Sequence, residues 1–157
     1  MKTSISKQLA AALFAAAALG GFPAVSTAAE HSKVADGIAM YLGVMPSEII
    51  RGQPQGAEAG MHGGMPAGGQ YHHVVVALFD SKNGKRITGA EVKAKVEQPG
   101  HLQFSEKKLE PMTINKTVSY GNFFAMPGPG PYQIFLTVRM PGSAKAVEAQ
   151  FEYIHPQ

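Results

Sequence analysis

The sequence of 157 residues contains no cysteine and no tryptophan, and the missing cysteine limits both fold and chemistry. Without disulfides, the fold must be held by its apolar core alone. No thiolate is available as a nucleophile or metal ligand, and no lipid can be attached through a cysteine at an export cleavage point. Any soft metal ion must therefore be bound by methionine and histidine, of which the chain has 8 and 6.

The excess of basic over acidic residues comes largely from the first residues of the chain. Lys2 and Lys7 precede an apolar run at residues 9–19, and Ser26-Thr27-Ala28 supplies the small residues that signal peptidase accepts. The run is too short for a membrane span. We expect residues 1–28 to be a signal peptide that directs the protein to the periplasm.

Removal of that segment lowers the net charge, because the two lysines leave with it. The 14 basic residues fall to 12 against 11 acidic residues, so the charge drops from +3 to +1. A strongly basic face of the kind that binds nucleic acid is therefore not expected.

Motifs of common enzymes are also missing. The sequence has no Gly-x-Ser-x-Gly elbow, no His-Glu-x-x-His pair and no phosphate-binding loop. Glu48, Glu58 and Glu110 are scattered among turn residues without a paired arrangement. We expect a protein that is not an enzyme.

The sequence does contain short apolar segments with a period of two, separated by Gly-Pro turns, and no convincing helix or repeat. Val92, Ala94 and Val96 alternate cleanly with charged residues, and Asn83-Gly84 and 127–131 are turn signals. About seven antiparallel strands in an immunoglobulin-like β-sandwich are predicted, in one domain over residues 38–155 after a flexible segment at 29–37. The expected strands are residues 38–45, 72–79, 91–97, 114–120, 122–126, 132–140 and 147–153, with residues 101–104 as a short strand or edge.

The segment from His73 to Tyr153 resembles small exported YtkA-like and FixH-like sandwich domains of bacteria. The resemblance lies in a strand followed by residues 80–92, and then in a Pro-Gly-rich turn before Tyr132-Gln133-Ile134. It implies a β-sandwich, and some members of these families are associated with copper handling or oxidase assembly. It transfers no metal ligand to this chain.

Potential metal ligands are concentrated in and after a glycine-rich loop at residues 51–70. Met61, His62 and Met65 surround the flexible Gly63-Gly64 pair, and His72 and His73 follow where an apolar strand begins. Thioether and imidazole suit copper, whereas oxygen-seeking ions prefer carboxylates. These five residues are therefore predicted to bind copper at one end of the sandwich.

The two consecutive histidines are not equivalent, because adjacent strand residues point to opposite faces. Only one of them is expected to join His62, and both could instead be rim residues that cap the sandwich. Zinc bound by His62, His72 and His73 is a further possibility, although no Asp or Glu lies at a spacing from them that would indicate a fourth zinc ligand.

Turn residues at the same end could complete the site. Met126 precedes one Pro-Gly turn and is included as a predicted ligand, while His101 follows another. The remaining methionines are expected to pack in the core or at a strand edge, and His155 is expected to lie in a C-terminal tail; these methionines are Met40, Met45, Met112 and Met140.

Cleavage after Ala28 would expose Ala29-Glu30-His31, whose amine, amides and imidazole can hold Cu(II) in a square plane. A start at Glu30 would destroy that spacing.

The sequence thus favours a periplasmic copper chaperone or buffer that hands the metal to an exported or membrane-bound recipient. The alternative is a metal-free module that docks on such a partner through the glycine-rich loop.

Overall fold

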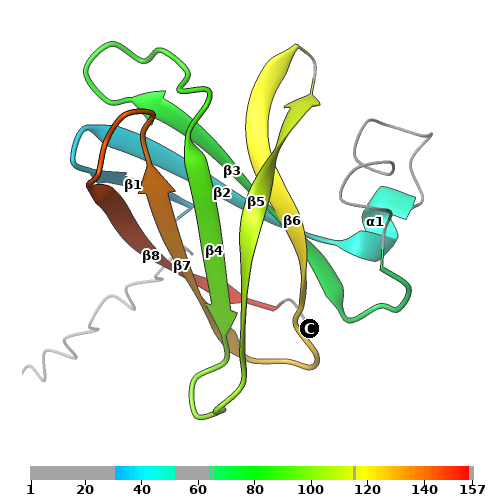
Figure 1. Cartoon of the computed structure of the whole chain (residues 1–157). Coiled ribbons are helices and arrows are strands. Elements are labelled where there is room, and N and C mark those ends of the chain that lie inside the picture. The colour runs from blue at the N-terminus through cyan, green and yellow to red at the C-terminus, as the bar shows by residue number, and fades with distance from the viewer. Residues whose placement is uncertain (1–30, 52–63, 65, 115, 156–157) are drawn as a thin grey trace, which may run out of the picture.

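The computed structural model describes residues 31–51, 64, 66–114 and 116–155, and these form eight antiparallel strands and one short helix (Figure 1). The strands are hydrogen-bonded in the order β1-β2-β3-β6-β5-β4-β7-β8. The elements are β1 (Ser32–Ala35), β2 (Ile38–Pro46), α1 (Ser47–Arg51), β3 (Tyr71–Asp80), β4 (Glu91–Glu97), β5 (Phe104–Ile114), β6 (Thr117–Ala125), β7 (Pro131–Arg139) and β8 (Ala146–Ile154).

Strand β5 joins the two halves of this arrangement. Its residues 104–109 pair with β4, whereas residues 110–114 pair with β6. Pro111, which has no N–H to donate, lies in the part that pairs on one side only, where a missing donor is tolerated. The strand therefore leaves one sheet and enters the other, as strands do at the corner of a barrel or sandwich.

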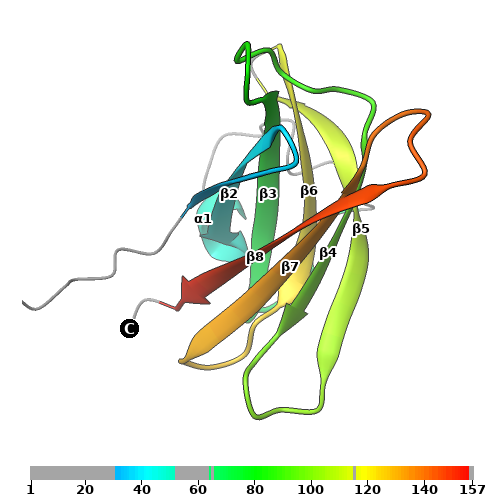
Figure 2. The ribbon, with the colours of Figure 1, turned by 90° about the vertical axis from the view of Figure 1, so that its left-hand side faces the viewer.

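Residues of alternating strand positions fill the space between the two sheets. Val74, Val76 and Leu78 of β3 face Val92, Ala94, Leu136 and other apolar side chains of the same core. Figure 2 shows the β7–β8 hairpin crossing β3 and β6 at an angle. The outer strands approach one another as well, since the Lys33 ammonium lies 5.7 Å from the centre of the Phe151 ring.

The two-sheet, all-antiparallel architecture predicted from the sequence is confirmed, with four local corrections. Residues 32–35 form β1 within the segment expected to be flexible, and residues 47–51 form a helical turn. Gly121 does not separate two strands, because β6 runs through it. Strand β5 is much longer than the predicted segment at 101–104, because hydrogen bonding to two different partners sustains it.

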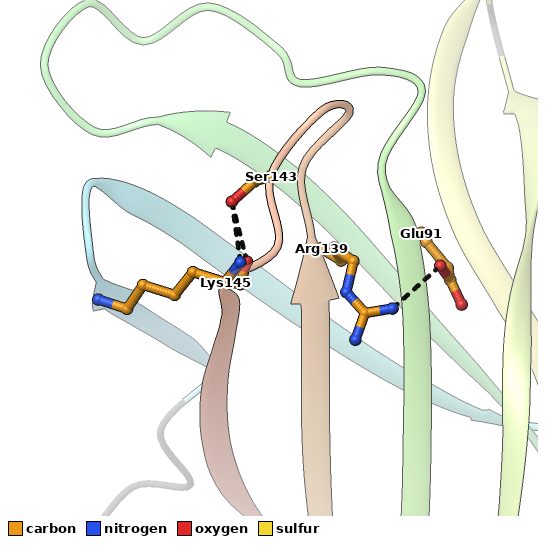
Figure 3. A network of polar contacts seen from close by, with 4 residues as sticks. All are labelled: Glu91, Arg139, Ser143 and Lys145. Atoms are coloured by element: carbon orange, nitrogen blue, oxygen red, sulfur yellow. Dashed lines mark hydrogen bonds and ion pairs between the residues drawn. The ribbon is translucent and has the colours of Figure 1, made fainter.

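The ends of the strands define two poles of the molecule. The turns after β2, β4 and β6, the start of β3 and the end of β8 gather at one pole (Figure 1), which we call the lower pole. The opposite pole carries the β7–β8 turn, where the Ser143 Oγ lies 3.2 Å from the Lys145 backbone N and Arg139 pairs with Glu91 at 3.6 Å (Figure 3). Such exposed contacts contribute little stability, so this pole is held mainly by the strands themselves.

Within the described residues, no helix has the length and apolar character needed to cross a membrane. The proposed signal peptide lies outside these residues.

Candidate metal centre

Two fully buried histidines follow Tyr71 at the start of strand β3. His72 and His73 have no solvent exposure, although they point to opposite faces of the sheet. His72 shares its face with Val74 and Val76, whereas His73 shares its face with Val75. The prediction that one regular strand cannot present both imidazoles to one ion is therefore supported by their placement.

His73 lies on the outer face of the sheet, against β6. Its ring stacks on Phe123, with the ring centroids 4.6 Å apart and the planes 25° from parallel. The two residues are direct partners in the β3–β6 register, which explains the contact. Phe123 is itself buried, so the imidazole is shielded from water on this side.

The sulfur of Met112 shares a small space with His73. A Cβ atom placed on Gly121 would lie 2.8 Å from the His73 Nε2 and 2.9 Å from the Met112 Sδ. Both atoms thus border the position that a side chain at residue 121 would fill. The register explains this, because β6 pairs with β3 on one side and with the second half of β5 on the other.

His72 points into the interior at the lower pole, where it meets Tyr153 of β8 and His155, which follows that strand. Its ring centroid is 4.7 Å from that of His155 and 5.9 Å from that of Tyr153. Neither ring nitrogen of His72 makes a hydrogen bond of regular geometry to another described residue. Burial, together with the nearby His155, lowers the pKa of His72, while the Gln70 backbone and Glu48 oppose that shift. Burial also raises the pKa of Tyr153.

His155 reaches this cluster because it continues the alternation of β8. Val147, Phe151 and Tyr153 face the interior, and His155 follows two positions later with a partly exposed side chain. Its backbone N–H lies 3.5 Å from the Gly130 carbonyl, which ties the end of the chain to the turn between β6 and β7. The sequence interpretation of His155 as an unremarkable tail residue missed this contact.

Met126 is placed at the lower pole as expected, but its side chain is almost fully buried in the apolar core. Its backbone N–H donates to the Gln70 carbonyl at 2.7 Å, so the Pro-Gly turn does lie beside the end of the glycine-rich segment. His101 is exposed in the turn between β4 and β5.

The predicted ligands Met61, His62 and Met65 lie outside the described residues, as do Ala29 and Glu30 of the proposed N-terminal site. Among the residues that the structure does describe, no three histidine, aspartate or glutamate side chains come together as a metal site. Any site with more than two donors in the described part of the chain must therefore include a donor of another kind, such as a thioether sulfur.

A family model described as Fe2+ transport protein matches residues 77–152. The comparisons support a small β-rich domain, and they give no support to the expected YtkA-like or FixH-like relationship. The search of curated proteins found no match.

Solved structures share the fold at low sequence identity. FetP from Escherichia coli is 16% identical, with a TM-score of 0.62 over 81% of this chain and 93% of its own. Copper-reconstituted P19 from Campylobacter jejuni is 14% identical, with a TM-score of 0.57 over 80% and 95%. A DUF4426 family protein from Pseudomonas aeruginosa is 12% identical, with a TM-score of 0.56 over 80% and 95%.

Met112 was expected to pack in the core or at a strand edge, and its buried side chain confirms this. Its place beside His73 was not predicted, and no sequence signal marks it, since it depends on β5 having left β4 to pair with β6 alone.

Proposed function

We propose that this chain is a periplasmic copper-binding protein that buffers or carries the metal. The proposal depends on one observation. The His73 Nε2 and the Met112 Sδ both lie beside Gly121, and both side chains are buried. Imidazole and thioether together are soft donors that favour copper over magnesium, calcium or manganese.

The residues present fit a soft ion better than a hard one. The described surroundings of His73 are aromatic and apolar, with Phe123 on one side and Met112 on another. A carboxylate shell of the kind that hard cations require is missing among the described residues near this pair. Bound copper would be held by the ring nitrogen and the sulfur, with further donors supplied by Met61, His62 and Met65 from the preceding loop.

The similarities point in the same direction. The matched family model concerns Fe2+ transport, whereas variants of FetP and P19 with the same fold are described as copper-bound. The thioether favours copper over Fe2+ in this chain, because sulfur donors select copper more strongly than they select Fe2+. Delivery to an exported or membrane-bound recipient stays a prediction.

Titration with Cu(I) against a chromogenic chelator tests the proposal. Met112→Leu removes the sulfur but keeps the side-chain volume, so the fold should tolerate it at less than about 1.5 kcal/mol. We expect its Cu(I) affinity to fall by more than about tenfold, since even outer-shell partners of a metal cause losses of that size. His62→Ala combined with Met65→Ala should also weaken binding.

Met40→Leu is the matched control, because Met40 is equally buried but faces the apolar core from β2. Its affinity should equal that of the wild type. A wild-type protein that leaves all copper with the chelator would refute the function, and equal affinities of the Met112 and Met40 variants would exclude Met112 as a ligand.

A further inference from the structure

We infer that Glu110 is a third donor to copper beside His73 and Met112, and that its carboxylate lets the site hold Cu(II) as well as Cu(I). The inference rests on the proposed copper function and deepens it. Glu110 was expected among turn residues, but it lies in β5, where that strand pairs with β6. Residues two apart on a strand point to the same face, so Glu110 and Met112 share the outer face of the sheet.

The strand register brings Glu110 to the same point as the other two donors. Glu110 pairs directly with Gly121 of β6. On its other side, Gly121 pairs with Val75 of β3, and His73 precedes Val75 on the same face. The Cβ position of residue 121 lies 2.8 Å from the His73 Nε2 and 2.9 Å from the Met112 Sδ. Directly opposed residues have Cβ positions about 5 Å apart, a gap that a glutamate side chain is long enough to span.

The absence of a side chain at residue 121 leaves room for an ion between the donors. A carbon atom at this point would be too close to the His73 nitrogen and the Met112 sulfur. A metal ion approaches its donors more closely than carbon does, since zinc lies about 2.0 Å from imidazole nitrogen and about 2.3 Å from cysteine sulfur. Small movements of the two side chains are therefore enough to bring both donor atoms to an ion above Gly121.

The Glu110 carboxylate is available for such an ion. Within the described residues, its side chain takes part in no hydrogen bond or ion pair, although Lys108 lies on the same face of β5. Glu110 is partly exposed, whereas the His73 and Met112 side chains are buried. Of the three donors, the carboxylate is thus the one that an ion arriving from solvent meets first.

Charge also favours a carboxylate at this position. Imidazole and thioether are neutral donors, so an ion bound by them alone would leave its whole positive charge among buried side chains such as Phe123. Burying an uncompensated charge is strongly unfavourable, and a bound carboxylate reduces that charge. The charge to compensate is larger for Cu(II), which also accepts oxygen donors more readily than Cu(I) does. Glu110 should therefore contribute more to the binding of Cu(II) than to the binding of Cu(I).

Competitive titration of both oxidation states tests the inference, with Cu(I) measured anaerobically and each ion measured against a chelator of known affinity. Glu110→Gln removes the charge but keeps the shape of the side chain. We expect its Cu(II) affinity to fall by at least about tenfold, since even outer-shell partners of a metal cause losses of that size. Its Cu(I) affinity should fall by a smaller factor.

Glu106→Gln is the matched control, because Glu106 is an exposed glutamate on the same face of β5 that pairs with Lys95 of β4 instead of with β6. Both of its copper affinities should equal those of the wild type.

Electron paramagnetic resonance of the Cu(II) form separates ligation from a general electrostatic effect, because the hyperfine coupling of copper responds to its donor atoms. The spectrum of Glu110→Gln should differ from that of the wild type, whereas Glu106→Gln should reproduce it. An unchanged Cu(II) affinity or spectrum in Glu110→Gln, or a wild type that binds Cu(I) alone, would overturn the inference and leave the proposed function intact. A wild type that binds neither ion would overturn both.

Discussion

At the scale of single residues, Gly121 shows how a missing side chain shapes the candidate site. The outer face of β6 approaches the His73 ring, the Met112 sulfur and the Val74 carbonyl so closely that no Cβ fits, since it would lie 3.2 Å or less from each. A glycine in the middle of a strand usually weakens it, and close approach of other groups is a common reason for keeping one.

Gly121→Ala should destabilise the protein by about 1–3 kcal/mol, because the added methyl group must push aside two buried side chains and a backbone carbonyl. Gly43→Ala in β2 is the matched control. Its new Cβ would meet nothing nearer than the Val75 carbonyl at 4.0 Å, so we expect a change within about 0.5 kcal/mol.

Urea unfolding of the metal-free proteins, followed by circular dichroism, would measure both values. Equal midpoints for the two alanine variants would show that the space beside Gly121 is not as crowded as described.

At the scale of elements, the turn between β6 and β7 connects the core to the lower pole. The buried Tyr132 hydroxyl donates to the Pro127 carbonyl at 2.7 Å and lies 3.4 Å from the Gly128 carbonyl. The same turn supplies Gly130, whose carbonyl faces the N–H of His155. The turn thus fixes both the start of β7 and the end of the chain.

Tyr132→Phe should therefore lower the free energy of unfolding by about 1 kcal/mol, the usual net worth of one hydrogen bond. Tyr41→Phe should change it far less, because Tyr41 is half-exposed on β2. Faster amide exchange at His155 in the Tyr132 variant, compared with the Tyr41 variant, would show that the turn also orders the chain end. The prediction fails if the two variants unfold at the same urea concentration.

The strand assignments show which parts of the fold can be predicted from the sequence alone. Strand β4 was predicted at its observed bounds because Val92, Ala94 and Val96 alternate with charged residues. β1 was missed because its four residues carry too little pattern, and they become a strand only by pairing with β2. The long β5 was missed because its two halves pair with different strands. The local pattern of apolar residues does not show this change of partner.

The candidate site was predicted in part for a similar reason. The histidine pair and its opposite orientations follow from local geometry, and they were predicted correctly. Met112 and His155 lie far along the chain from β3, and only the strand order brings them to it. Long-range partners of this kind cannot be read from spacing, whereas the donor types could.

At the scale of the whole molecule, the proposed site links strands that are distant in sequence. His73 and Met112 connect β3 with β5. An unfolded chain would not hold these donors together, so a bound ion stabilises the native state.

Cu(I) at a free concentration of 100 times its dissociation constant should add about 2.7 kcal/mol to the free energy of unfolding at one site. For a domain of this size, the melting temperature should rise by roughly 5–10 °C. Anaerobic calorimetry with and without the metal would measure the shift, with His101→Ala expected to match the wild type. A His73→Phe variant that still shows the full increase would contradict the assignment of His73 as a ligand.

The side-by-side placement of His72 and His73 also makes metal loading a check on strand alignment. If β3 slid by one residue against its neighbours, the two rings would exchange faces, and the valines behind them would leave the interior. His73 would then no longer lie beside the Met112 sulfur. Normal copper binding therefore indicates that β3 has paired with its neighbours in the correct register.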